Sequence, residues 1–387
     1  MRLGIDATSI RSGGGLTHLV EVLKAARPAQ YGFDGIVVWG RVATLTQIPE
    51  KPWLSKVPHA MQERNLLLRT YWQWFRLADS VRRSKCDLLF VPGGSYAGNF
   101  RPVVTMSQNM LPFERREARR YGLSATSLRL AMLRCSQAVT LRRASGVIFF
   151  SEYARNTIMS AIGTLRGQLI TVPHGIHRRF IHAPRVQKNM AEYSPASPMR
   201  LIYVSIVDLY KHQWTVCEAV CSLRKEGFPI ALDLIGPAYP RALRKLTATL
   251  RNIDPDGVAV RYLGQVPHDE LHELYASADV GVFASSCENM PNILIECMAS
   301  GLPIACSNRG PMPEVLGDGG VYFDPETSAS IADAIRRLLV SPELRAKVAQ
   351  VAFVRAGPYS WERCADETLR FLAQIASAGE RVPAIEH

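Results

Sequence analysis

The sequence predicts an α/β protein with two doubly wound domains, each built on a parallel sheet. Short apolar runs alternate with segments of helical period along most of the chain, which is the pattern of strands joined by helices. The alternation breaks once, near the middle, where prolines and polar residues gather. The 387 residues, 47% of them hydrophobic and 21% charged, fit two globular domains and disfavour long disorder, collagen and coiled coil.

The N-terminal half begins this pattern. Its expected strands are Leu3–Ile5, Leu88–Val91, Val103–Thr105 and Gly146–Phe150. Helices are expected over Leu16–Ala25 and over an arginine-rich stretch between residues 115 and 143. Prolines and polar residues then indicate a linker over residues 182–198.

The C-terminal half repeats the pattern. Its expected strands are Leu201–Val204, Ala231–Ile235, Val258–Leu263, Val280–Ala284 and Pro303–Cys306. Its expected helices lie near residues 213–226, 239–252, 269–277, 291–300 and 327–340. We therefore expect an N-terminal domain over 1–181, a C-terminal domain over 199–358 and one more amphipathic helix within 359–387, whose docking site the sequence leaves open. Open α/β sheets bind ligands at the carboxyl ends of their strands, so the two domains are expected to face each other across a cleft.

The formal net charge of +12 is unevenly distributed. Residues 1–185 carry 27 Lys and Arg against 10 Asp and Glu, whereas residues 186–387 carry 19 against 24. An anionic partner of the N-terminal half is one explanation, and it would be nucleic acid, an anionic membrane surface or a phosphorylated substrate. A solvated basic surface without a special partner is the other.

The sequence also indicates a compartment. No apolar run reaches the roughly 18–20 residues that span a bilayer, and Asp6 interrupts the N-terminus too early for a signal peptide, so we expect a cytoplasmic protein. None of the eight cysteines forms a CxxC pair, and most lie in apolar stretches. We expect them to be reduced and mostly buried, without a zinc site.

The segment from Glu288 to Glu296 carries the clearest chemical signal. It follows an expected strand and begins a helix, in which Pro291 suits the first turn and Gly301 suits the left-handed residue after the last turn. Free N–H groups and the helix dipole make such a turn an anion site, suited to a phosphate or a sugar oxygen. Carboxylates only accept hydrogen bonds, so two of them favour a ligand with hydroxyls, such as ribose or a hexose. Alternatively, Glu288 caps the helix and Glu296 is solvated.

This segment resembles the donor site of a known family. Two glutamates separated by seven residues, followed by Ala299–Ile304 and Gly310–Val315, look like the C-terminal donor site of the family-4 retaining glycosyltransferases of the GT-B fold. The runs Tyr262–Val280 and Tyr322–Pro325 match as well. The resemblance covers residues 199–340, and the N-terminal half more loosely, and it implies two Rossmann-like domains.

The resemblance implies roles for single residues. Glu296 would bind the nucleotide ribose, and Glu288 would contact the transferred sugar near the reacting centre. The backbone of Val266 would face the nucleobase. The peptide N–H groups implied to hold sugar and phosphate oxygens are those of Asn289, Met290 and Asn292, because Pro291 has no N–H.

Lys211 lies in a stretch that resembles the family's Gly-Arg-Leu then Lys-Gly sequence, and it would neutralise the donor diphosphate. The family's arginine is Ile206 in this chain. Neutralisation of the donor diphosphate would therefore depend more on Lys211 and on helix N-termini. Alternatively, another arginine would substitute for the family's arginine. On the residues alone, Lys211 is equally well explained as a solvated loop lysine.

Three glycines, Gly13, Gly14 and Gly15, follow the first strand and allow the backbone to approach a ligand closely. They are not a dinucleotide fingerprint, because His18 occupies the position of its third glycine. The resemblance places this loop in the cleft, near the acceptor and the donor phosphates. An ordinary strand-to-helix turn is the alternative.

Gln108 and Asn109 occupy the positions of the family's His-Asp pair. A glutamine cannot act as a base, but it can hydrogen-bond sugar hydroxyls or the acceptor. In the family the leaving phosphate is thought to take the acceptor proton, so the substitution need not abolish activity. The resemblance thus implies Glu288 and Gln108 as the residues nearest the chemistry.

The arginine-rich stretch suggests one or two basic amphipathic helices. One explanation is anionic membrane association, since each basic residue near such a surface contributes about 1 kcal/mol, and the other is a solvated helix face. The nearby aromatic residues are expected to belong to the core rather than to a membrane anchor. They are Tyr71, Trp72, Trp74 and Phe75.

Two metal-like patterns are discounted. His268 and His272 have the spacing of a zinc helix, but Asp269 stands where the motif needs Glu, at an expected helix start where it makes a good cap. Asp254 and Asp256 imitate an Asp-x-Asp motif but lie in a sequence typical of a surface turn. We expect no metal, and no cofactor apart from the nucleotide sugar as substrate.

The sequence therefore predicts a retaining, metal-independent hexosyltransferase acting on a growing, lipid-linked cell-surface glycan of the lipopolysaccharide or exopolysaccharide type. We expect it in the cytoplasm, peripheral on the inner face of the membrane. The alternatives are a GT-B sugar-nucleotide epimerase and a non-catalytic nucleotide-sugar-binding paralogue, which Ile206 and Gln108 suggest. A nucleic-acid binder is disfavoured, because the arginines lack interleaved stacking aromatics and no binding motif occurs.

Overall fold

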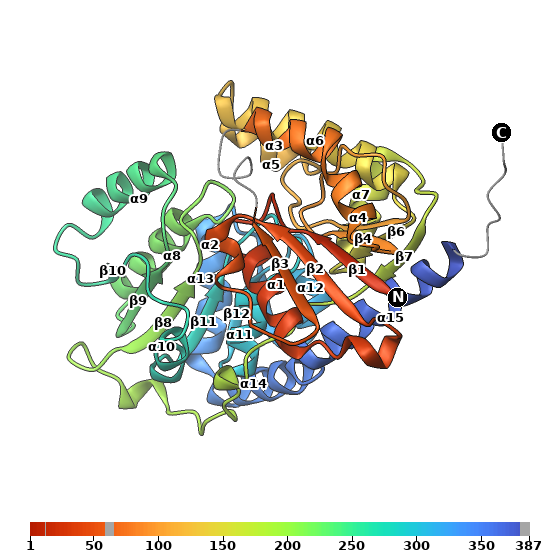
Figure 1. The fold of residues 1–387 in the computed structure, drawn as a ribbon. Helices are drawn as coiled ribbons and strands as arrows, with labels where there is room; N and C mark the ends of the chain where they lie inside the picture. Colours follow the sequence, from red (N-terminus) through yellow and green to blue (C-terminus); the bar gives the residue numbers. More distant parts are fainter. Residues whose placement is uncertain (12, 59–65, 380–387) are drawn as a thin grey trace. The chain divides into compact units, whose positions relative to one another are not determined.

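The computed structural model describes residues 1–11, 13–58 and 66–379, and the chain forms two compact units (Figure 1). The first unit comprises Met1–Ala118, Gly122–Gly175 and the chain from Ser360 onward. The second comprises Arg119–Tyr121 and Ile176–Tyr359. The first unit is thus assembled from both ends of the described chain.

The first unit is built on a seven-stranded parallel sheet in the order β3-β2-β1-β4-β5-β6-β7. Its strands are β1 (Arg2–Asp6), β2 (Gly35–Gly40), β3 (Leu54–Pro58), β4 (Leu88–Val91), β5 (Val103–Met106), β6 (Gly146–Phe149) and β7 (Gln168–Thr171). Its α-helices are α1 (Gly14–Ala25), α2 (Val42–Leu45), α3 (Leu66–Phe75), α4 (Leu77–Arg83), α5 (Arg115–Ala118), α6 (Ala125–Arg143), α7 (Glu152–Ile162) and α15 (Trp361–Gly379). The inner strands β4, β5 and β6 are buried throughout, as expected for a parallel sheet covered by helices on both faces.

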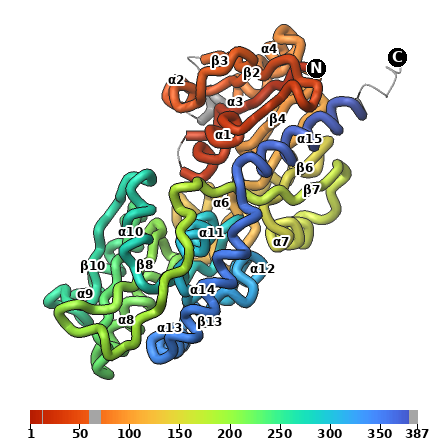
Figure 2. Tube along the Cα trace, turned by 90° about the horizontal axis from the view of Figure 1, so that it is seen from below, coloured from red at the N-terminus to blue at the C-terminus, as the bar shows by residue number. Residues whose placement is uncertain are grey.

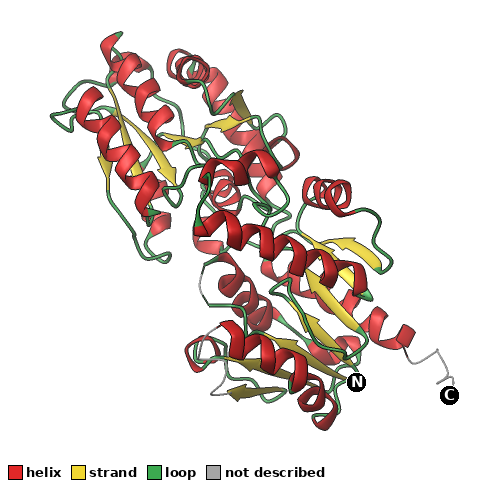
Figure 3. Ribbon diagram, turned by 90° about the horizontal axis from the view of Figure 1, so that it is seen from above, coloured by secondary structure: helices red, strands yellow, loops and turns green. Residues whose placement is uncertain are grey.

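The second unit repeats this plan with a six-stranded parallel sheet in the order β10-β9-β8-β11-β12-β13. Its strands are β8 (Met199–Val204), β9 (Ile230–Ile235), β10 (Val260–Tyr262), β11 (Val280–Phe283), β12 (Ile304–Ser307) and β13 (Gly320–Phe323). Its α-helices are α8 (Gln213–Lys225), α9 (Pro240–Ile253), α10 (Leu271–Ser277), α11 (Asn292–Ala299), α12 (Met312–Leu316), α13 (Ser328–Val340) and α14 (Pro342–Ala356). Figure 3 shows strands flanked by helices in each unit.

Short 3-10 turns complete the described elements. They are η1 (Pro28–Tyr31), η3 (Arg119–Tyr121), η4 (Arg178–Phe180) and η5 (Met190–Glu192). The prediction of two doubly wound α/β sheets is confirmed, and each strand predicted from an apolar run overlaps a strand of the structure.

The segment predicted as a linker, residues 182–198, lies within the second unit and is packed against it. The Arg185 guanidinium donates to the carbonyls of Ala276 and Ala278. The fully buried Arg345 donates to the Lys188 carbonyl. Proline and polar residues marked this segment as irregular, but its backbone is held by arginine side chains.

The last helix, α15, answers the question of docking that the sequence left open. It packs on α1 and β4 in the first unit, and Figure 2 shows it running beside these elements. The close approach at its start requires a glycine, because a Cβ on Gly175 would lie 2.2 Å from the backbone nitrogen of Trp361. The first unit therefore needs the chain on both sides of the second.

All eight cysteines are free, and seven of them are buried, which confirms their predicted state. The exception is Cys135 on α6. Among the described residues, no helix is both long and apolar enough to cross a membrane.

Candidate functional site

The chain order of the second sheet locates a ligand site. Strands β8 and β11 are neighbours, and the chain leads from β8 to β9 on one side and from β11 to β12 on the other. Ligands of open α/β sheets bind at such a reversal, beyond the carboxyl ends of the two strands. The loop after β8 carries Lys211, and the loop after β11 carries Glu288.

These two loops bring Lys211 and Glu288 into contact. The Lys211 Nζ forms an ion pair and hydrogen bond with Glu288 Oε1, and the exposed fractions of the two side chains are 8% and 16%. A buried charge needs such a partner, because its hydration is lost on folding. Lys211 is therefore a paired, buried lysine, and the alternative of a solvated loop lysine is wrong.

Aromatic residues fix the position of Lys211. The Tyr203 hydroxyl donates to the Lys211 carbonyl at 2.7 Å. The ammonium lies 5.1 Å from the ring centroid of Tyr210 and 5.5 Å from that of Phe283, within reach of a cation–π interaction. Burial, and next the charge of Glu288, raises the pKa of Tyr210 well above its ordinary value, so this tyrosine stays neutral.

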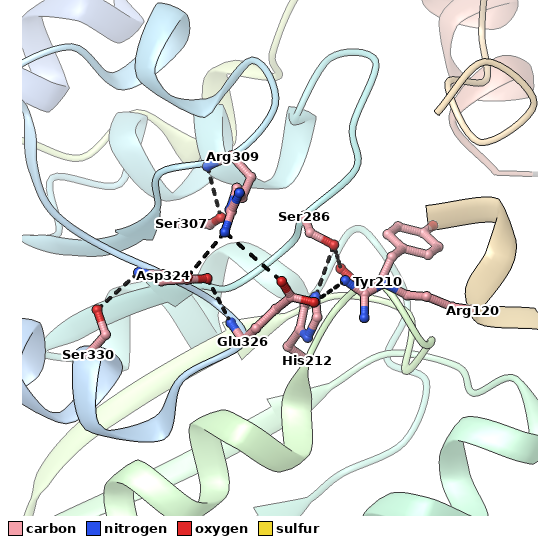
Figure 4. Close-up of polar contacts among 9 residues, drawn as sticks. All are labelled: Arg120, Tyr210, His212, Ser286, Ser307, Arg309, Asp324, Glu326 and Ser330. Atoms are coloured by element: carbon pink, nitrogen blue, oxygen red, sulfur yellow. Dashed lines mark hydrogen bonds and ion pairs between the residues drawn. The ribbon is translucent and has the colours of Figure 1, made fainter. Parts of the chain in front are cut away.

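Hydrogen bonds between Tyr210, His212 and Ser286 hold the two loops together (Figure 4). The Ser286 N–H donates to the Tyr210 carbonyl at 2.8 Å, and the Ser286 hydroxyl donates to the same oxygen at 3.2 Å. The His212 Nε2 lies 2.9 Å from the Ser286 oxygen. Since that hydroxyl proton is used on Tyr210, His212 donates from Nε2 to Ser286. These hydrogen bonds fix the loop after β8 against the loop after β11.

Glu296 lies on α11 and is also buried, with 6% of the residue exposed. Its Oε1 is 2.8 Å from His268 Nε2. Its other oxygen, Oε2, is buried without a hydrogen-bond partner. An unpaired buried carboxylate oxygen is costly, so Oε2 is an acceptor held ready for a donor such as a hydroxyl. The alternative of a solvated Glu296 is wrong.

His268 is oriented from its other side by Arg179. The Arg179 Nη2 lies 3.1 Å from His268 Nδ1, and Arg179 can only donate. Nδ1 therefore accepts, and Nε2 carries the proton that His268 donates to Glu296. Arg179, His268 and Glu296 form a relay that fixes one oxygen of Glu296 and leaves the other available. The sequence analysis missed this role, because it considered His268 only as a metal ligand.

The N-terminus of α11 differs in detail from the expectation. The helix begins at Asn292, and Pro291 is its N-cap rather than part of the first turn. The Asn292 N–H donates to the Met290 carbonyl at 3.0 Å, so it is occupied and not directed at a ligand. Asn289 and Met290 are both buried beside this turn.

Val266 is half-buried in the loop after β10. The contact of His268, two residues later, with Glu296 brings this loop to α11. The predicted helix start at Asp269 is wrong, because α10 begins at Leu271 with Glu270 as its N-cap. The loop thereby stays irregular up to the residue that contacts Glu296.

Another arginine lies beyond β12, where it could substitute for the missing basic residue at Ile206. Arg309 Nη2 is 3.1 Å from Asp324 Oδ2 and 4.0 Å from Glu326 Oε2 (Figure 4). Glu326 also pairs with Arg120. Two carboxylates therefore neutralise Arg309, and it would have to leave Asp324 to bind a phosphate.

In the first unit, two predicted site residues lie against each other. A Cβ on Gly15 would lie 2.3 Å from Gln108 Oε1, so a larger residue at this position would displace the Gln108 amide. Gly14 has open space around its Cα, and Gly13 is the N-cap of α1 with φ +69°. The glycine loop thus shapes the surroundings of Gln108.

Behind this loop lies a buried histidine pair that the sequence analysis did not predict. His18 Nδ1 and His174 Nδ1 are 3.0 Å apart, and the rings of Phe150 and Trp361 cover them. Burial lowers the pKa of His18 to about 3, and burial with the neighbouring His18 lowers the pKa of His174 well below its ordinary value. Both rings are neutral, with one donating and the other accepting.

Comparison with known sequences identifies a family for the second unit. A family described as "Glycosyl transferases group 1" matches residues 188–354. The O-antigen chain mannosyltransferase B of Escherichia coli is 36% identical over 110 residues, which are 28% of this chain and 29% of that protein. The chain thus matches less than a third of this relative's length.

Solved structures resemble this chain over nearly its whole length. Sucrose-phosphate synthase from Thermosynechococcus elongatus superposes with a TM-score of 0.75 at 17% identity, covering 98% of this chain and 100% of that one. HepE of Anabaena, solved with UDP and glucose, gives a TM-score of 0.66 at 18% identity, covering 99% and 100%. Residues 188–354 therefore match the group 1 glycosyltransferases, and the chain has the GT-B fold.

Proposed function

We propose that this protein is a retaining, metal-independent hexosyltransferase that takes its sugar from a nucleotide sugar. One observation carries the proposal. Within the segment that matches the family, Lys211 is paired with Glu288, and Glu296 presents a buried oxygen without a partner. This is a site for a ligand with both negative charge and hydroxyl groups.

Each side chain has a role in this proposal. The donor diphosphate attracts the Lys211 ammonium from Glu288 and is neutralised by it as the leaving group departs. Glu288 is then released to accept hydrogen bonds from hydroxyls of the transferred hexose. Glu296 Oε2 accepts from a ribose hydroxyl, while the relay through His268 holds the carboxylate in place.

The acceptor is proposed to be a growing, lipid-linked surface glycan of the lipopolysaccharide or exopolysaccharide type. Support for this acceptor comes from the name of the E. coli relative, an O-antigen mannosyltransferase, whereas HepE, solved with UDP and glucose, supports the nucleotide-sugar donor. In the first unit, the Gln108 amide hydrogen-bonds the acceptor. The protein is proposed to act in the cytoplasm, attached peripherally to the membrane by its basic N-terminal half.

A ligand screen followed by a turnover assay tests the proposal. Thermal unfolding is measured with UDP-, GDP- and dTDP-hexoses, and at 100 times Kd the correct donor stabilises the protein by about 2.7 kcal/mol. The Glu296→Ala variant should lose most of this stabilisation, while the matched Glu343→Ala variant, at an exposed carboxylate of α14, should keep it. NMR of the product should show the donor's anomeric configuration, and chelation of metals should leave the rate unchanged.

Each other outcome identifies a rival. Binding without turnover on any lipid-linked acceptor indicates a non-catalytic paralogue. An isomerised nucleotide sugar formed without acceptor indicates an epimerase. Absence of stabilisation by every nucleotide sugar contradicts the proposal as a whole.

A further inference from the structure

The outer face of α6 exposes apolar side chains along its length. Leu128, Met132 and Val139 are 64%, 53% and 44% exposed. Together with the exposed Cys135, their spacing of three and four residues places them on one stripe of the helix. At 1.5 Å per residue, a 19-residue helix is about 28 Å long, so the stripe is a substantial apolar surface.

A second group of exposed apolar residues lies on α3. The sequence placed these aromatics in the core, but only Trp72 is buried there. Tyr71, Trp74 and Phe75 are 46%, 55% and 59% exposed. Three exposed aromatic rings within five residues are unusual for a surface that faces only water.

A pocket joins the two groups within the first unit. It has a volume of about 370 Å³, and Trp74 of α3 lines it together with Val139 and Arg143 of α6. The loop before β5 contributes Tyr96 and Arg101. Its size is that of a small ligand pocket, roughly 300–1,000 Å³.

The polar groups of this pocket are largely satisfied by one another. The Thr140 hydroxyl accepts from the Tyr96 N–H at 2.9 Å and lies 3.2 Å from the Tyr96 carbonyl. The Tyr96 hydroxyl accepts from the Phe100 N–H at 3.0 Å. The pocket therefore offers a ligand mainly apolar surface, flanked by the guanidinium groups of Arg101 and Arg143.

The charge around the pocket selects among possible occupants. Arg101 and Arg143 line the pocket, and α6 has no Asp or Glu, although Arg134 and Arg142 of this helix donate to the carbonyls of Ala161 and Ile162. A second copy of this surface would oppose arginines to arginines, which disfavours a symmetric dimer. Basic residues beside apolar and aromatic ones fit the interface of an anionic bilayer, where the rings and hydrocarbon parts enter the lipid and the charges stay at the headgroups.

We infer that the exposed face of α3 and α6 lies on an anionic membrane and that the pocket takes one hydrocarbon chain of an anionic lipid. Arg101 and Arg143 bind its headgroup at the pocket mouth. This inference deepens the membrane part of the proposed function and identifies its surface. It does not depend on the chemistry of sugar transfer.

Flotation with lipid vesicles tests the surface. The full-length protein should float with vesicles of phosphatidylcholine and phosphatidylglycerol at low salt, and less with phosphatidylcholine alone. Val139→Glu should lower the partition coefficient about tenfold or more, and Arg143→Gln about fivefold. Val354→Glu is the matched control, because Val354 is 63% exposed on α14 of the other unit, and it should float like the wild type.

Fluorescence quenching tests the pocket. Trp74 is an exposed tryptophan, whereas Trp39, Trp72, Trp214 and Trp361 are buried. Phosphatidylglycerol with brominated chains should quench the wild type, and Trp74→Phe should lose this quenching while it still floats. Flotation without quenching of Trp74 would show headgroup adsorption only and overturn the pocket.

The controls separate this inference from the proposed function. Equal flotation of the wild type and Val139→Glu, or no flotation at low salt, overturns the membrane surface. Binding to nucleic acid or to an acidic peptide, without binding to vesicles, would also overturn the membrane surface. Calorimetry with the donor should give the same Kd for Val139→Glu and the wild type. Vesicle binding by a protein that binds no nucleotide sugar would contradict the proposed chemistry and leave this surface intact.

Discussion

The site of the second unit and helix α6 of the first unit hold positive charge in different ways. In the second unit, Lys211 is buried against Glu288, and Arg309 is paired with Asp324. On α6 of the first unit, Arg134 and Arg142 donate to backbone carbonyls, and the helix has no carboxylate. The first arrangement suits a ligand that exchanges partners at short range, and the second suits attraction over a distance to an anionic surface.

This difference predicts which of the two binding events, to the membrane or to the donor, should depend on salt concentration. Interactions of exposed charges are screened within about 8–10 Å at physiological ionic strength, whereas buried pairs are screened much less. Membrane binding through the first unit should therefore weaken with salt, and donor binding through the second should change little. Four predictions test this contrast, from the largest expected effect to the smallest.

The largest effect is expected for Lys211→Ala. It removes the cation that stabilises the leaving diphosphate, so kcat should fall about 100- to 1,000-fold. It also leaves Glu288 buried without its partner, which should lower the free energy of unfolding by about 3 kcal/mol in urea. Arg336→Ala breaks the exposed pair with Glu226 and should cost at most about 1 kcal/mol. Equal costs for both variants would contradict the buried character of the Lys211 pair.

Next is the effect of Glu296→Gln on donor affinity. The amide keeps the shape of the side chain but loses the charge, and hydrogen bonds to charged groups are worth about 1.5–3 kcal/mol. The Kd of the nucleotide sugar should therefore rise about 10- to 150-fold by calorimetry, with little change at higher salt. An unchanged Kd would remove Glu296 from the donor site.

The third prediction is that the histidine pair of the first unit makes the stability of the protein depend on pH. In the unfolded chain, His18 and His174 bind protons below about pH 6.5, but in the folded protein they stay neutral, since the pKa of His18 is about 3. Acidification below about pH 6.5 should therefore destabilise the protein, by about 1 kcal/mol at pH 5.5 through His18, and His174 contributes in the same direction. His18→Phe should reduce the pH dependence of the urea midpoint. A profile identical to that of the wild type would contradict this origin.

The smallest effect is expected for His268→Ala. Loss of the relay frees Glu296 to change its position, and one hydrogen bond of about 0.5–1.5 kcal/mol predicts a rise of about 2- to 12-fold in Kd. His268→Gln can still donate to Glu296 and should recover part of the affinity. If His268→Gln and His268→Ala behave alike, the hydrogen bond is not what matters.

The fold was largely predictable because its signal is local. Apolar runs mark strands that are buried on both faces, and this pattern located β8, β9 and β11 within a few residues. Four of the described strands were missed: β2, which is buried throughout, and three strands of mixed exposure, β3, β7 and β13. The half-buried β7, for example, has the sequence Gln-Leu-Ile-Thr. The helices expected near residues 213–226, 239–252 and 327–340 lie within a few residues of α8, α9 and α13, whereas α7 and α14 were missed although serine caps both.

The candidate site was only partly predictable. Glu288, Glu296 and Lys211 were found because their spacing resembles a family pattern, and the structure shows that Lys211 and Glu296 are buried and Glu288 is half-buried. The contact between His268 and Glu296 was not predictable, because it joins residues 28 positions apart that no local pattern connects. The exposed aromatics of α3 were misplaced, because hydrophobicity alone does not distinguish a core from an interface.

The return of α15 to the first unit has a consequence for biosynthesis. Gly175 and Ser360 belong to the same unit, but a ribosome needs roughly 10–40 s to make the about 185 residues between them, at 5–20 residues per second. Throughout that time the histidine pair lacks the cover of Trp361, whereas every described strand of the second unit is made before Trp361. The nascent chain should thus complete its later unit first, and its earlier unit last.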